Sequence, residues 1–81
     1  MSIVNEFNLY NRLRDSLIEN FNTKVRSDTL SNADISSTDR ELRYIRRCML
    51  KIMRENLDIK LKATVWRFVN GYYIKWSYDN V

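Results

Sequence analysis

The chain has 81 residues, with one glycine, no proline, no histidine and a single cysteine. This length allows one domain with a small core. Without histidine the chain lacks the usual acid–base group at neutral pH and the commonest metal ligand, and one thiol alone cannot build a structural zinc site. A single glycine also excludes phosphate-cradling loops, which need several glycines. Composition therefore favours a binding or regulatory domain over an enzyme, and we expect no catalytic site, no cofactor and no metal.

Signals for export or membrane insertion are not evident in the sequence. The first residues contain no basic stretch followed by an apolar run, which is the pattern of a secretory signal. No stretch approaches the roughly 18 consecutive apolar residues of a membrane-spanning helix. Hydrophobic residues make up 44% of the chain, enough for a folded core, and scarce cysteine is compatible with a reducing compartment. We expect a folded cytoplasmic protein without a membrane span.

Apolar and aromatic residues recur at steps of three and four near the N-terminus, which predicts an amphipathic helix over residues 5–22. Its apolar face carries Phe7, Tyr10, Leu13, Leu17 and Phe21. Ser2 or Asn5 is expected to cap the first turn. Residues 23–37 are rich in serine, asparagine and aspartate and predict a long connection, with a short strand near 24–26 or one helical turn near Asn32 as alternatives.

A second amphipathic helix is predicted over residues 39–55. Thr38 and Glu41 have the spacing of a capping box, in which each side chain bonds the backbone N–H of the other residue. Asn56 is the expected stop. The apolar residues that follow at helical spacing are Leu42, Ile45, Met49, Ile52, Met53 and Leu57.

The last third of the chain predicts a β-hairpin. Asn70-Gly71 separates two runs of β-branched and aromatic residues, and both residues tolerate the positive φ of a tight hairpin turn. We place the strands at 63–69 and 72–78. Residues 57–61 alternate in polarity and form either a third short strand or the lead into the hairpin, while a helix that continues to residue 70 is the rival interpretation. The expected fold class is α+β, with two amphipathic helices packed on a C-terminal antiparallel hairpin.

A two-residue turn fixes which hairpin residues share a face. It pairs Val69 with Tyr72, Arg67 with Ile74, Val65 with Trp76, and Ala63 with Tyr78. The face assigned to the core carries Val65, Val69, Ile74, Trp76 and Tyr78. The other face carries Thr64, Trp66, Phe68, Tyr73, Lys75 and Ser77.

The aromatic residues of that second face are more than a solvated sheet needs. They predict a partner-binding surface at Trp66, Phe68 and Tyr73, or a homodimer interface, because aromatic residues beside Arg and Lys are enriched in interfaces. Two alternatives remain. Phe68 and Tyr73 stabilise the hairpin only as a cross-strand pair, or the helices cover this face and leave Tyr72 and Tyr78 outside.

A basic stripe is predicted on the second helix, opposite its apolar face. Its members are Arg40, Arg43, Arg47, Lys51 and Arg54. Residues 39–62 hold eight basic and four acidic side chains, so this segment carries the whole net charge of +4. Arginine favours recognition of carboxylates or phosphates, so the stripe could contact an acidic protein, nucleic acid or a membrane surface. The plain interpretation is the solvated outer face that every amphipathic helix has.

Three blocks of the sequence, Glu6–Leu13, Tyr44–Met49 and Val65–Lys75, resemble the accessory lysis inhibition proteins of T-even-type bacteriophages. The resemblance spans most of the chain. It implies a cytoplasmic antiholin, a regulatory protein that binds the cytoplasmic part of the phage holin and delays pore formation and host lysis. It assigns no role to any individual residue.

Overall fold

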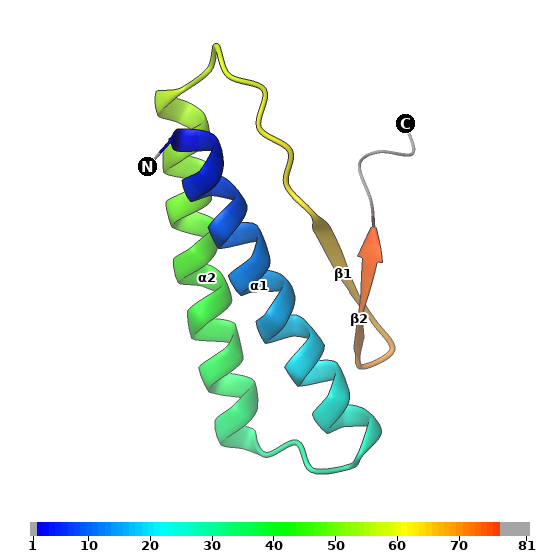
Figure 1. Ribbon diagram of the computed structural model, residues 1–81. Coiled ribbons are helices and arrows are strands. Elements are labelled where there is room, and N and C mark those ends of the chain that lie inside the picture. Colours follow the sequence, from blue (N-terminus) through cyan, green and yellow to red (C-terminus); the bar gives the residue numbers. More distant parts are fainter. Residues whose placement is uncertain (1, 77–81) are drawn as a thin grey trace.

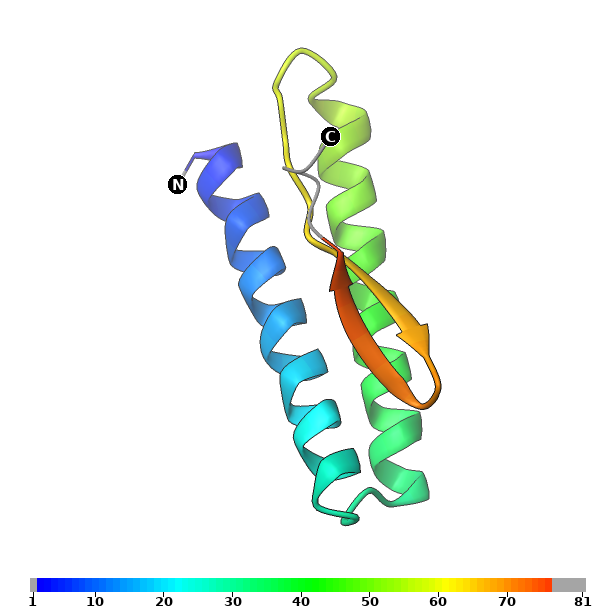
Figure 2. The same cartoon turned by 90° about the vertical axis from the view of Figure 1, so that its right-hand side faces the viewer.

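The computed structural model describes residues 2–76, which form two long helices followed by a two-stranded antiparallel hairpin. The elements are α1 (Ile3–Arg26), α2 (Asn32–Glu55), β1 (Val65–Val69) and β2 (Tyr72–Trp76). The helices run antiparallel side by side, and the chain after α2 returns over one side of the pair before it forms the hairpin (Figure 1). Seen from that side, this returning segment lies over the line between α1 and α2 (Figure 2). The α+β fold class is confirmed.

Helix α1 is longer at both ends than predicted. The Ser2 hydroxyl accepts a hydrogen bond from the backbone N–H of Asn5 (3.1 Å), so Ser2 is the N-cap of the two candidates. The helix continues to Arg26, and the alternative of a strand over 24–26 is wrong because these residues form its last turn. It ends where the backbone N–H of Ser27 bonds back to the carbonyl of residue 23.

Helix α2 begins at Asn32, so the predicted start at residue 39 is wrong. Ser31 is the N-cap: its hydroxyl accepts from the N–H of Asp34 (3.1 Å), and the Asp34 carboxylate accepts from the N–H of Ser31 (3.0 Å). This is a capping box with aspartate in place of the usual glutamate. Asp34 also pairs with Nζ of Lys24 (2.8 Å), which joins the last turn of α1 to the first turn of α2. Because α1 ends at residue 26 and α2 begins at residue 32, the long connection predicted over 23–37 is wrong. Asn56 ends α2 as predicted.

The core lies between the two helices and under the returning segment. Its buried apolar residues are Phe7, Ile18, Phe21, Ile45, Met49 and Ile52. Leu61 and Ala63 of the returning segment pack against this core and are half-buried. Residues 57–64 are neither strand nor helix, so the third strand and the continued helix are both wrong.

The hairpin register is confirmed within the described residues. Val69 pairs with Tyr72 across the turn, and the pairing continues to residues 65 and 76. Asn70 and Gly71 have φ values of 54° and 87°, the left-handed conformation that this tight turn requires. β1 begins at residue 65 and not at residue 63 as predicted, while the predicted end of the second strand, residues 77–78, lies outside the described residues.

Candidate interaction surfaces

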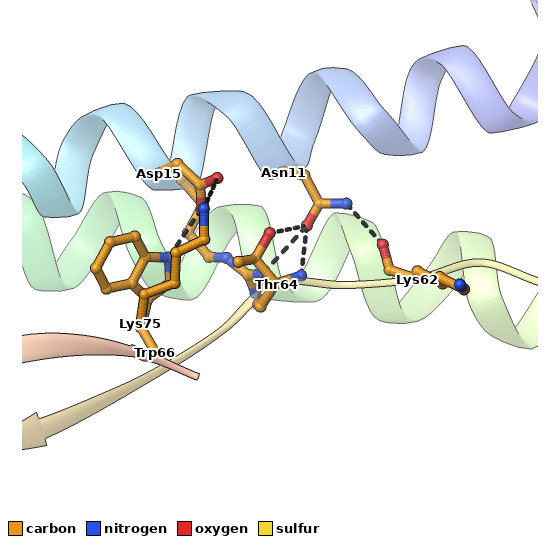
Figure 3. A network of polar contacts seen from close by, with 7 residues as sticks. Asn11, Asp15, Lys62, Thr64, Trp66 and Lys75 are labelled. Atoms are coloured by element: carbon orange, nitrogen blue, oxygen red, sulfur yellow. Dashed lines mark hydrogen bonds and ion pairs between the residues drawn. The ribbon is translucent and has the colours of Figure 1, made fainter. Parts of the chain in front are cut away.

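Three polar side chains on one face of α1 hold the C-terminal part of the chain. Asn11, Asp15 and Asn22 are spaced by four and seven residues, so they point in similar directions from the helix. Asn11 is buried, and its Nδ2 donates to the carbonyl of Lys62 (2.9 Å). Its Oδ1 accepts from the backbone N–H of Thr64 (3.1 Å; Figure 3). We call Asn11, Asp15 and Asn22 the polar clasp.

Asp15, the second clasp residue, contacts both strands of the hairpin. Its Oδ1 accepts from the indole Nε1 of Trp66 on β1 (2.8 Å), and its Oδ2 lies 3.9 Å from Nζ of Lys75 on β2 (Figure 3). The same Nζ lies 5.8 Å from the centre of the Trp66 ring. One carboxylate of α1 therefore orients the indole and the lysine together.

Asn22, the third clasp residue, bonds the edge of β2. Its Nδ2 donates to the carbonyl of Tyr73 (2.8 Å), and its Oδ1 accepts from the N–H of the same residue (2.9 Å). The side chain thus takes the place of a neighbouring strand at this position. Beside it, Phe21 makes edge-to-face ring contacts with Tyr73 (5.3 Å between centroids) and Phe68 (6.2 Å).

The aromatic face of the hairpin is therefore turned toward α1, and the predicted assignment of the two faces is wrong. The residues assigned to the core included Val69 and Ile74, which are 43% and 50% exposed. Trp66 and Tyr73, assigned to the outer face, are half-buried against α1. The alternative in which the helices cover this face and leave Tyr72 outside is the arrangement observed. Tyr78 and the side chain of residue 76 lie outside the described part of the chain.

The physical reason is that α1 offers partners for the polar atoms of the aromatic face. Asp15 accepts from the indole N–H of Trp66, whereas the side chains of Val69 and Ile74 have no polar group that α1 could bond. Asn22 bonds the backbone of Tyr73 and so holds β2 beside α1. Of the three aromatic residues predicted to form the partner-binding surface, Phe68 is the most exposed, at 57%. Trp66 and Tyr73 serve mainly to dock the hairpin.

The basic stripe lies on the outer side of α2, and all five of its side chains are exposed. The buried residues of the helix, Ile45, Met49 and Ile52, lie on the opposite side, as the periodicity predicts. Within residues 2–76, Arg43 is the one stripe residue in an ion pair, with Asp39 (3.1 Å). An exposed pair of this kind contributes about 1 kcal/mol at most. The ion pairs of the stripe therefore contribute little to the stability of the fold.

A groove that sequence reasoning missed lies between α2 and the first residues of the hairpin, with a volume of about 530 Å³. Its walls include Leu42, Leu50 and Met53 from α2 and Ala63, Val65 and Trp66 from the C-terminal part. Arg14 of α1 and Arg46 of α2 also line it. No sequence pattern indicates this groove, because the groove depends on where residues 63–66 cross the helices.

Asp34 and Tyr73 also have shifted pKa values. A hydrogen bond from Lys24, followed by those with Ser31, lowers the pKa of Asp34 to about 2. Burial is the first cause that raises the pKa of Tyr73, and the charge of Asp39 acts in the same direction. Among residues 2–76, no three histidine, cysteine, aspartate or glutamate side chains are grouped so that they could hold a metal ion.

Comparison with protein-family models, curated proteins and solved structures finds no match to this chain. No helix in residues 2–76 is long and apolar enough to cross a membrane.

Proposed function

We propose that this chain is a small regulatory protein that binds another protein stoichiometrically, with the basic stripe of α2 as its docking surface. The observation that carries the proposal is that the five stripe side chains are exposed in one row and take almost no part in the fold. Arginine on a rigid helix suits the recognition of carboxylates, because its planar guanidinium forms paired hydrogen bonds. An acidic segment of a partner protein fits this surface.

The resemblance to accessory lysis inhibition proteins suggests the partner. A cytoplasmic antiholin would bind the cytoplasmic part of a T-even-type phage holin in the host cell and delay lysis. The absence of a catalytic motif in the sequence agrees with an inhibitor that acts by occupancy. Phe68, whose ring is exposed at the side of the hairpin, is a second candidate contact for this partner.

Calorimetric titration with the cytoplasmic segment of such a holin tests the proposal. We expect one-to-one binding by the native chain and a loss of at least about tenfold in affinity, or roughly 1.4 kcal/mol, in the double variant Arg43→Glu, Arg47→Glu. The matched control is Arg12→Glu, Arg26→Glu, which changes the net charge equally at exposed positions of α1. Equal affinity of the two double variants would contradict the role of the stripe, and no binding by the native chain would exclude this holin segment.

Nucleic acid is the alternative partner, because the same row of cations could contact phosphates. A net charge of +4 is modest for such a protein, and Asp39 and Glu41 lie among the arginines. A gel-shift titration with duplex DNA and RNA at two salt concentrations distinguishes the two functions. Binding that weakens steeply with salt would favour nucleic acid, and the lack of a shift would favour the protein partner.

A further inference from the structure

The groove between α2 and residues 63–66 combines an apolar lining with two positive charges. Leu50 and Met53 on its α2 side are 40% and 37% exposed, which leaves apolar area open to solvent. The charged residues that line it are Arg14 and Arg46, and no carboxylate is among the described residues of the lining. The groove is thus complementary in charge to an acidic ligand and in polarity to an apolar one.

Arg14 adds a second observation that indicates an anion. Burial lowers the pKa of its guanidinium, which means that its charge has lost part of its hydration. Its Nη2 donates to Oδ1 of Asn11 (3.1 Å) and to the carbonyl of Thr64, but its Nε is buried without a hydrogen-bond partner in the described part of the chain. The neighbouring carboxylate of Asp15 opposes the lowered pKa, yet that carboxylate already accepts from Trp66. A partially desolvated guanidinium is stabilised by a nearby carboxylate through charge alone, without contact with the buried Nε.

The groove is also continuous with the basic stripe. Arg46 and Leu50 line both the groove and the shallow hollow around Arg40, Arg43 and Arg47. One peptide segment that crosses α2 would therefore meet arginines on the outer face first and the apolar groove next.

We infer that this groove binds a peptide segment of the partner protein that places apolar side chains against Leu50, Met53 and Val65 and carboxylates near Arg46 and Arg14. The inference rests on the proposed function in that the ligand is a protein, and it adds the chemistry of the bound segment. Charge complementarity selects this occupant, since two guanidinium groups border a mostly apolar lining that contains no carboxylate among the described residues.

Selection of random linear peptides displayed against the full-length chain tests the inference. The enriched sequences are expected to combine aspartate or glutamate with leucine, isoleucine, valine or aromatic residues. Addition of an enriched peptide is expected to shift the NMR signals of the Trp66 indole N–H and of the backbone amides of residues 63 and 64. Enrichment of basic sequences, or the absence of any enriched sequence, would overturn the inference.

Two pairs of variants then locate the site. Leu50→Ser is matched by Leu9→Ser, because Leu9 is 39% exposed but lies on α1 away from the groove. Arg46→Glu is matched by Arg12→Glu, another exposed arginine of α1. Each groove variant is expected to weaken an enriched peptide by about tenfold or more, and each control by less than about threefold. Equal losses in the two members of each pair would exclude the groove.

The failure of the groove and the failure of the proposed function are distinguishable. Arg43 and Arg47, which test the stripe, do not line the groove. If the holin segment loses affinity in the stripe variant while the enriched peptides ignore Leu50→Ser and Arg46→Glu, the groove is refuted and the proposed function stands. If the holin segment loses affinity in Leu50→Ser and Arg46→Glu but not in the stripe variant, the stripe is refuted as the docking surface.

Discussion

Replacement of Asn22 by alanine tests whether the polar clasp holds the hairpin to α1. Asn22 is 8% exposed, and its side chain makes two hydrogen bonds, both to the backbone of Tyr73. Alanine removes both bonds and leaves the N–H and the carbonyl of Tyr73 without this partner at a half-buried position. The hairpin then has one fewer anchor on the helix, and its edge strand loses the group that replaces a neighbouring strand.

The expected loss follows from the two bonds. Each contributes about 0.5–1.5 kcal/mol net, so the free energy of unfolding should fall by about 1–3 kcal/mol. A chain of this size has a total of roughly 4–12 kcal/mol, so the loss is a large fraction of the stability. At about 4–8 °C per kcal/mol for a small domain, the melting temperature should fall on the order of 10 °C.

Urea unfolding and hydrogen exchange measure the effect, with Asn20→Ala as the control. Asn20 is exposed on the same helix, and the same substitution changes helix propensity equally. Asn22→Ala should lower the urea midpoint well below that of the control and should accelerate exchange of the Tyr73 amide. If the unfolding free energies of the two variants differ by less than about 0.5 kcal/mol, the clasp at Asn22 does not stabilise the fold and the reasoning is refuted.

Three further predictions concern the turn and the start of α2. Gly71→Val should destabilise the chain by about 1–3 kcal/mol through backbone strain alone, because a Cβ there meets no atom within 4 Å, and Gly71→Asn should cost less in the same thermal melt. Ser31→Ala should cost about 1 kcal/mol in urea unfolding, whereas equal effects of Ser31→Ala and Thr38→Ala would contradict the observed cap. The pKa of Asp34 is lowered to about 2 from 3.8, so its contribution to stability is present above about pH 4 and lost as the pH falls through 2; NMR should find this midpoint, and Lys24→Ala should raise it.

Local signals in the sequence were enough to predict the elements and the hairpin register. Asn70-Gly71 specifies a two-residue turn wherever the flanking residues favour strands, and this fixes the pairing without reference to the helices. The start of α2 was mispredicted for a local reason as well. Thr38 and Glu41 match the usual capping box, but Ser31 and Asp34 form one earlier in the chain, and the pair between Asp34 and Lys24 favours the earlier start.

The orientation of the hairpin could not be predicted from its own residues. Both of its faces are apolar enough to be buried, so the pattern alone does not decide between Val69 with Ile74 and Trp66 with Tyr73. The decision depends on α1, where Asp15 and Asn22 lie 51 residues before their partners in the sequence. The groove depends on the same long-range contacts, because residues 63–66 form one of its walls.

The helices share the core, but polar contacts hold the hairpin to α1, whereas the proposed binding surfaces lie mainly on α2. An isolated two-stranded hairpin is marginally stable in water, so this one depends on the polar clasp and on the ring contacts of Phe21. Its tryptophan and tyrosine at 66 and 73, which resemble interface residues in the sequence, are used inside the fold. Under the proposed function a partner would contact mainly α2, through the basic stripe on its outer side and the groove at its edge. Substitutions in the stripe should thus change binding without changing stability, and substitutions in the clasp should lower stability before they affect binding.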